Sequence, residues 1–303
     1  MPISRSRFRR AFLASGVGVL VISSAIVHAQ PSPPFEIPPP HWSGLPIWGT
    51  EAAARGYQLP LPFGIGVTLY SARQPVNIHD LKLGRAPNPP VSVTNFLQID
   101  RVDTSQQNAS AKFDVLVLPF LDVYALAGYT TGTTKGIIEV PEIPGLDFSP
   151  AQLQLNARFK GPTYGWGLTL QGGAKVSESP DLLVFAVADV NQTKTVLSFS
   201  NEQLLADTKP SATVFSARLG LNGPTGQSTT GSIWVGGMYQ RIQQEVAGSV
   251  ANTDLQFIVV QSAAKPWNTL VGGLLEFDKE FGLLLEGGFG GRMSILAQIG
   301  YRF

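Results

Sequence analysis

Three features of the sequence predict an all-β protein whose strands form a transmembrane antiparallel barrel. Apolar and polar residues alternate through much of the chain after residue 62, which is the period of strands with one face in lipid and one face wet. The N-terminus has the pattern of an export signal, and the last strand ends on Tyr301 and Phe303. Together these features predict about twelve strands, with ten as the alternative.

Residues 1–29 are interpreted as a secretory signal peptide. Positive charge comes first, from Arg5, Arg7, Arg9 and Arg10. An uncharged apolar run at 12–27 follows, and small or apolar residues lead to cleavage after Ala29. The pair Arg9 and Arg10 also fits a twin-arginine signal, which exports folded proteins. Because a barrel must cross the inner membrane unfolded, we interpret the pair as ordinary signal-peptide charge.

Residues 30–58 are predicted to form a leader ahead of the barrel, which takes residues 59–303. Seven prolines between 30 and 48 favour an extended periplasmic segment that cannot join a sheet. Residues 50–56 favour one short helix, with Thr50 as a candidate N-cap and Gly56 closing it.

The alternation then predicts a series of strands, each about as long as a tilted strand that crosses the bilayer. Their predicted ranges are 63–70, 76–83, 94–104, 109–117, 123–132, 164–171, 184–191, 215–221, 233–239, 271–277, 281–289 and 293–303. With the C-terminus periplasmic, the short turns lie in the periplasm. The long loops at 132–161, 195–211 and 242–266 then lie outside, with a local strand at 255–260. An even strand count requires the weak segment 76–83.

A soluble β-sandwich has the same period, because it also buries one face of each strand. The signal peptide, the aromatic residues near strand ends and the terminal Phe303 favour the membrane barrel.

The terminal strand has a sequence pattern that resembles that of a known family. One parity is wholly apolar, and its residues are Met293, Ile295, Ala297, Ile299, Tyr301 and Phe303. This end resembles the C-terminal strand of Gram-negative outer-membrane β-barrel proteins. The resemblance implies location in the outer membrane, contact with its lipid, and handling by periplasmic chaperones and the barrel-assembly machinery. It also implies that Tyr301 and Phe303 serve as an assembly signal.

Composition excludes several kinds of chemistry. The chain has no cysteine, so disulfides, thiolate metal sites and a cysteine nucleophile are ruled out. Its formal net charge of +1 gives no reason to expect a nucleic-acid partner. We expect no cofactor and no metal. The oligomeric state is left open.

The inward parity gathers the charged residues of the strands. These candidate lumen residues are Lys112, Asp114, Asp189, Arg218, Glu276 and Glu286. They could form a salt-bridge network that fills a small barrel, since an eight-stranded interior is just filled by side chains. They could equally line a narrow solute pore.

The pattern therefore favours a narrow passive channel or transporter of small solutes. A structural or surface-interaction barrel with partner-binding external loops is the alternative, and a membrane-embedded lipid-modifying enzyme is the third hypothesis. Catalytic signals are poor: His41 and Ser43 lie in the leader, and His79 has no serine or aspartate at a clear same-face spacing. We expect no enzymatic activity.

Overall fold

The computed structural model describes residues 44–55, 57, 59–96, 98–99, 102–140, 151–178, 181–201, 204–250 and 254–303. By its contacts the chain divides into two units, Met1–Pro40 and His41–Phe303. Every element below belongs to the second unit. The signal peptide, the leader up to residue 43 and the His41–Ser43 pair therefore lie outside the described residues.

The described elements are almost all strands. They are α1 (Gly49–Ala54), β1 (Phe63–Arg85), β2 (Val91–Ser92), η1 (Thr94–Phe96), β3 (Gln98–Ile99), β4 (Val102–Leu118), β5 (Leu121–Val140), β6 (Ala151–Glu178), β7 (Asp181–Thr195), β8 (Leu197–Asn201), β9 (Leu204–Thr208), β10 (Ser211–Pro224), β11 (Thr229–Val250), β12 (Leu255–Ala263), β13 (Trp267–Phe277), β14 (Phe281–Gly290) and β15 (Met293–Arg302).

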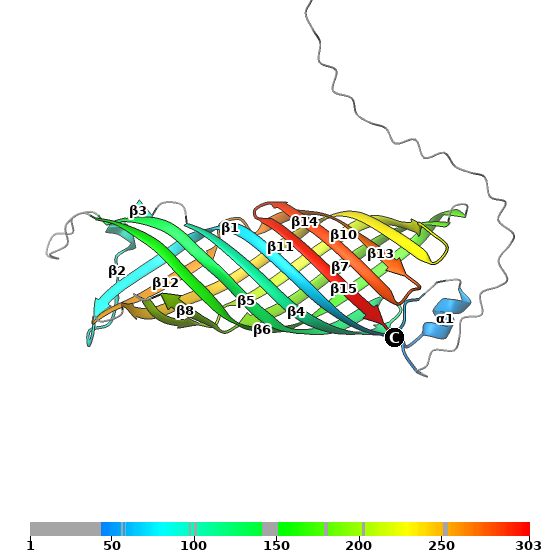
Figure 1. The fold of residues 1–303 in the computed structure, drawn as a ribbon, viewed down its shortest axis with the longest axis horizontal. Helices are drawn as coiled ribbons and strands as arrows, with labels where there is room; N and C mark the ends of the chain where they lie inside the picture. The colour runs from blue at the N-terminus through cyan, green and yellow to red at the C-terminus, as the bar shows by residue number, and fades with distance from the viewer. Residues whose placement is uncertain are drawn as a thin grey trace, which may run out of the picture. The chain divides into compact units, whose positions relative to one another are not determined.

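Ten of these strands form a closed antiparallel barrel. In order around the ring they are β1, β4, β5, β6, β7, β10, β11, β13, β14 and β15. The ring closes where β15 pairs with β1, from Gly64 opposite Arg302 to Arg73 opposite Met293. Figure 1 shows these strands running obliquely around the barrel, with the C-terminus at one end and β2, β3 and β8 at the other. Closure leaves no sheet edge within the ring, as a membrane requires.

The prediction of twelve strands is wrong, and the alternative of ten holds for this ring. Segments 63–70 and 76–83 are one strand, β1, rather than two. Pro75 does not break this strand, because it lies where the neighbour on one side changes from β15 to β12. Its carbonyl accepts a hydrogen bond from the Ala264 amide at 3.1 Å, and its missing N–H is not needed for a continuous ladder. Similarly, β4 is one continuous strand from Val102 to Leu118, so the break predicted between strands 94–104 and 109–117 is absent.

The predicted long external loops are largely strands. β5 extends to Val140 and β6 begins at Ala151, so both continue well beyond the length that crosses a bilayer. β11 likewise extends to Val250. The local strand predicted at 255–260 is present as β12. We call this continuation of the barrel, on the side away from the C-terminus, the external wall.

Short strands complete the external wall where ring strands stop. β12 pairs with both β1 and β11 above the ends of β13, β14 and β15. The β8–β9 hairpin pairs with β6 and β11 above the ends of β7 and β10. These additions satisfy backbone groups that would otherwise form exposed edges.

The outward side chains of the ring form an apolar belt. Val67, Leu219 and Ile233 expose 57–66% of their surface, although each lies in the middle of a strand. Aromatic rings mark both rims of this belt. At the C-terminal rim Phe63 stacks with Phe303 at 5.9 Å, and at the other rim Tyr239 meets Trp267 edge-on at 5.1 Å. An apolar belt between aromatic rims is typical of a barrel that spans a membrane.

The helix α1 and the turn between β13 and β14 were both predicted from the local sequence, and both are present. α1 begins one residue earlier than predicted, and Trp48, with φ of 67°, takes the N-cap position instead of Thr50. The predicted turn between β13 and β14 is present, with Asp278 and Lys279 at φ of 52° and 62°. Among the described residues, no helix is both long enough and apolar enough to cross a membrane.

Candidate functional site: the barrel lumen

An ion pair crosses the interior at mid-height. Arg218 of β10 donates from Nε to Glu286 Oε2 at 2.6 Å and from Nη2 to Glu286 Oε1 at 2.9 Å. The two residues come from strands separated in the ring by β11 and β13, so the pair spans part of the lumen. Trp234 of β11 donates its indole N–H to the same Glu286 carboxylate at 2.7 Å. Glu286 is only 4% exposed, so its charge depends on these donors.

A second carboxylate lies on the neighbouring wall. Asp189 of β7 accepts hydrogen bonds from the Tyr124 hydroxyl and the Thr169 hydroxyl, each at 2.9 Å. The Asn191 amide donates to its other oxygen at 3.1 Å. We call Arg218, Glu286, Trp234, Tyr124 and Asp189 the mid-lumen cluster.

Glycines give the large rings of this cluster room to lie across neighbouring strands. A Cβ at Gly272 of β13 would come within 2.7 Å of the Trp234 ring, and one at Gly167 of β6 would overlap the Tyr124 ring. A side chain at either position would push the ring away from its carboxylate partner. The glycines are therefore part of the cluster's construction.

A further set of charges lies toward the C-terminal end of the barrel. Lys112 contacts Asp114 at 3.3 Å and Asp122 at 3.7 Å, and Arg302 contacts Asp114 at 2.9 Å. The Lys112 ammonium also lies 4.6 Å from the centre of the Tyr124 ring. Since the Tyr124 hydroxyl bonds Asp189, the two sets of charges form one connected interior network.

Hydroxyl groups line the opposite end of the interior. Thr130 and Thr163 are 2.7 Å apart at their hydroxyl oxygens, and Thr163 and Thr195 are 3.0 Å apart. Thr104 and Thr134 form a similar pair at 2.9 Å. We call these five residues the threonine row. The interior therefore carries polar groups along the barrel, beside buried apolar side chains such as Leu270 and Phe159, while the outer belt is apolar.

The structure places the six candidate lumen residues on inward positions, and it brings four of them into direct or shared contacts. Lys112 meets Asp114, and Arg218 meets Glu286. Asp189 lies beside Tyr124, and Glu276 accepts a hydrogen bond from Thr230 at 3.3 Å. Glu276 stands apart from the mid-lumen cluster.

Sequence reasoning missed Trp234, Tyr124, Asp122 and Arg302 as interior residues. For Trp234 a signal existed, because Ile233 and Val235 on either side face outward, so its parity is inward. Asp122 was assigned to a turn, whereas it is the second residue of β5. Because only charged residues were considered as lumen candidates, the aromatic residues Trp234 and Tyr124 were not included.

Tyr301 and Phe303 lie on the outer face at the C-terminal rim. Phe303 exchanges backbone hydrogen bonds with Phe63 at 2.9 and 3.1 Å, and its ring lies 6.0 Å from that of Tyr301. These contacts close the seam between β15 and β1. No contact within the barrel bears on their predicted role in assembly.

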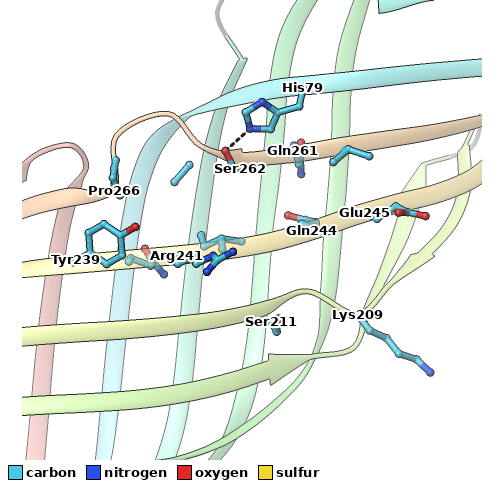
Figure 2. A pocket seen from close by; sticks show the side chains of 14 residues that line it. His79, Lys209, Ser211, Tyr239, Arg241, Gln244, Glu245, Gln261, Ser262 and Pro266 are labelled. Carbon is cyan, nitrogen blue, oxygen red and sulfur yellow. Dashed lines mark hydrogen bonds between the residues drawn. The ribbon is translucent and has the colours of Figure 1, made fainter. Parts of the chain in front are cut away.

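A pocket opens in the external wall between β11 and β12 (Figure 2). Its volume is about 690 Å³, and its lining includes His79, Tyr239, Arg241, Glu245 and Ser262. His79 Nε2 lies 2.7 Å from the Ser262 hydroxyl, a meeting of distant strands that same-face spacing did not reveal. A catalytic triad would also need a third group on the other ring nitrogen, and the described residues place no hydrogen-bond partner there. The described residues also hold no cluster of three or more His, Asp or Glu arranged for a metal.

The closed ring, the apolar belt with aromatic rims and the polar interior define the class of protein. A barrel of this kind buries its polar groups inward and offers lipid its outer face. The chain is an outer-membrane β-barrel protein.

Comparisons with known proteins gave structural likenesses only. No protein-family model matches the chain, and no curated protein matches it. Among solved structures, the outer membrane protein OprG from Pseudomonas aeruginosa aligns with 81% of this chain and 98% of its own, at 12% identity and a TM-score of 0.39. The transport unit of the autotransporter AIDA-I from Escherichia coli aligns with 80% of this chain and 90% of its own, at 10% identity and a TM-score of 0.37. The Pseudomonas putida toluene transporter TodX aligns with 83% and 92%, at 10% identity and a TM-score of 0.28. The activities in these names belong to those proteins.

Proposed function

We propose that the protein is a narrow passive channel for small solutes across the outer membrane. The observation that carries this proposal is the polar interior, which runs from the Lys112 and Arg302 charges through the mid-lumen cluster to the threonine row. A barrel with only a structural task can fill its interior with apolar side chains, at no cost in buried charge. Ten strands also enclose more space than the eight whose interior is just filled.

The mid-lumen cluster is the constriction of this channel. Glu286, Trp234 and Tyr124 are each less than 9% exposed, so protein atoms rather than open water surround their side chains. A solute passes only if the Arg218–Glu286 pair rotates aside. This requirement favours small polar solutes and low conductance.

Single-channel recording in a planar bilayer tests the proposal. We expect small conductance steps from the refolded protein, and larger steps when Arg218 and Glu286 are both replaced by Ala, because the constriction then widens without a change in net charge. The matched control replaces Lys175 and Asp181 by Ala, an exposed pair 3.2 Å apart at the C-terminal end of the barrel, away from the mid-lumen cluster. If wild type and the lumen variant are both silent, the channel proposal is wrong.

A second candidate is a surface-interaction barrel, which one observation favours. β6 has 28 residues and β1 has 23, so the wall stands well clear of the bilayer and presents a large external surface. Electrically silent protein with cell-surface binding that disappears when the external wall is shortened would support this candidate over the channel.

A further inference from the structure

Three exposed cations lie on the outer face of β6 and β7. Arg158, Lys160 and Lys194 are exposed, and no ion pair within the described part of the chain involves them. Some other cations are paired, such as Arg73 with Asp103 at 3.4 Å and Lys82 with Asp80 at 3.6 Å, whereas Arg55 and Arg85 are exposed and likewise form no ion pair within the described part of the chain. We call Arg158, Lys160 and Lys194 the basic patch.

The register fixes the height of the patch relative to the membrane. On β6 the outward positions run Trp166, Tyr164, Pro162, Lys160 and Arg158, and the two aromatic side chains are more than half exposed. They belong to the outer aromatic rim, and the cations follow immediately beyond it. Four residues of a tilted strand raise Lys160 by about 10 Å above Tyr164. Lys194 of β7 lies directly opposite Tyr164.

This is the level of lipid head groups on the external side. Aromatic rings sit at the boundary between hydrocarbon and head group, and Lys and Arg side chains reach from there toward anionic groups. Their apolar stems can lie along the aromatic residues while the charged ends extend outward.

The patch carries one sign of charge only. From residue 156 to 176 of β6, and from 182 to 194 of β7, no outward position holds Asp or Glu. Lys135 on β5 is left out of the patch, because Asp103 faces it directly across the sheet. A face of β6 and β7 that carries only cations at head-group height is complementary to phosphate.

We propose that the basic patch binds the phosphate groups of an anionic glycolipid of the outer leaflet. The acyl chains of this lipid would lie on the apolar outer face below, against Trp166 and Leu170, which are 55% and 51% exposed. The site is independent of the channel, because its residues point away from the lumen.

The test uses the folded protein in nanodiscs of zwitterionic lipid, titrated with a bis-phosphorylated glycolipid of the lipid A type. Bound lipid is counted by native mass spectrometry. We expect the triple variant Arg158→Gln, Lys160→Gln, Lys194→Gln to raise the apparent Kd by about tenfold or more. The same glycolipid without its phosphates should bind the wild type as weakly as the phosphorylated form binds the variant.

A matched control separates a site from bulk charge. The variant Arg55→Gln, Arg85→Gln, Lys175→Gln removes three exposed cations away from the outer rim, and it should bind like the wild type. Different gel migration of boiled and unboiled samples confirms that each variant is folded. Equal losses in the two variants, no loss in the patch variant, or equal binding of the dephosphorylated lipid would each overturn the proposal. Displacement of the lipid by millimolar inorganic phosphate would assign the patch to soluble anions instead.

Discussion

Arg218 is the most informative single residue of the lumen, because Glu286 receives two of its hydrogen bonds. Replacing Arg218 by Leu leaves a 4% exposed carboxylate for which, among the described residues, the Trp234 indole is the remaining side-chain donor. We expect the free energy of unfolding to fall by about 3–5 kcal/mol, the cost of breaking a buried pair on one side. Thermal unfolding in detergent measures this loss.

The double variant Arg218→Leu, Glu286→Leu provides the control. Because it removes both charges, it should recover most of the lost stability. If the lumen were instead wide and watery, Arg218→Leu would leave stability nearly unchanged and would shift ion selectivity toward cations. A single variant that is unchanged in both stability and reversal potential would contradict the interior position of Arg218.

Gly272 tests how tightly the mid-lumen cluster is built. A valine there meets the Trp234 ring, whose nearest atom would lie 2.7 Å from the new Cβ. Overpacking of this kind costs about 1–3 kcal/mol, so we expect Gly272→Val to lower the unfolding temperature. The control is Gly172→Val, since a Cβ at Gly172 meets nothing within 4 Å. Equal effects of the two substitutions would show that strand propensity, not contact with Trp234, is responsible.

At the scale of elements, the continuity of β1 decides where residues 86–90 lie. In the structure β1 extends through Arg85 into the external wall, so Asn88 lies at the end of the barrel away from the C-terminus, which we expect to be outside the cell. In a twelve-stranded barrel the same residue would be periplasmic. The chain has no cysteine, so we expect Asn88→Cys to react with a membrane-impermeant maleimide on intact cells.

Ser228→Cys is the matching control for this experiment. Ser228 is exposed in the turn between β10 and β11, at the same end of the barrel as the C-terminus. It should react only after the outer membrane is broken. Labelling of Ser228→Cys but not Asn88→Cys on intact cells would show that the topology is inverted or that β1 is divided.

At the scale of the whole molecule, the closed ring makes folding all-or-none and dependent on an apolar surrounding. Each strand of the ring has hydrogen-bonded neighbours on both sides, and the exposed belt requires lipid or detergent. We expect to find the protein in the outer-membrane fraction. On a gel, the unheated protein should migrate to a different position from the boiled, unfolded chain. Recovery as a soluble periplasmic protein would contradict the architecture.

The fold class and the inward or outward direction of most side chains can be predicted from the sequence alone. Alternation is a local property with a period of two, so Ile233 and Val235 can be assigned to one face without knowing their neighbours. The six candidate lumen charges follow from the same parity. The turn at Asp278 and Lys279 was also readable, because polar residues between two apolar strands favour a turn there.

The strand count, the external wall and the partners of each charge depend instead on how distant strands pair. Pro75 and the polar residues around it suggest a turn locally, but β12 and β4 flank this part of β1 and keep it extended. Arg218 meets Glu286 because ring closure brings β10 and β14 to the same lumen, although the residues are 68 positions apart in the chain. Pairing between distant strands depends on closure of the whole sheet, and no local pattern of residues encodes that register.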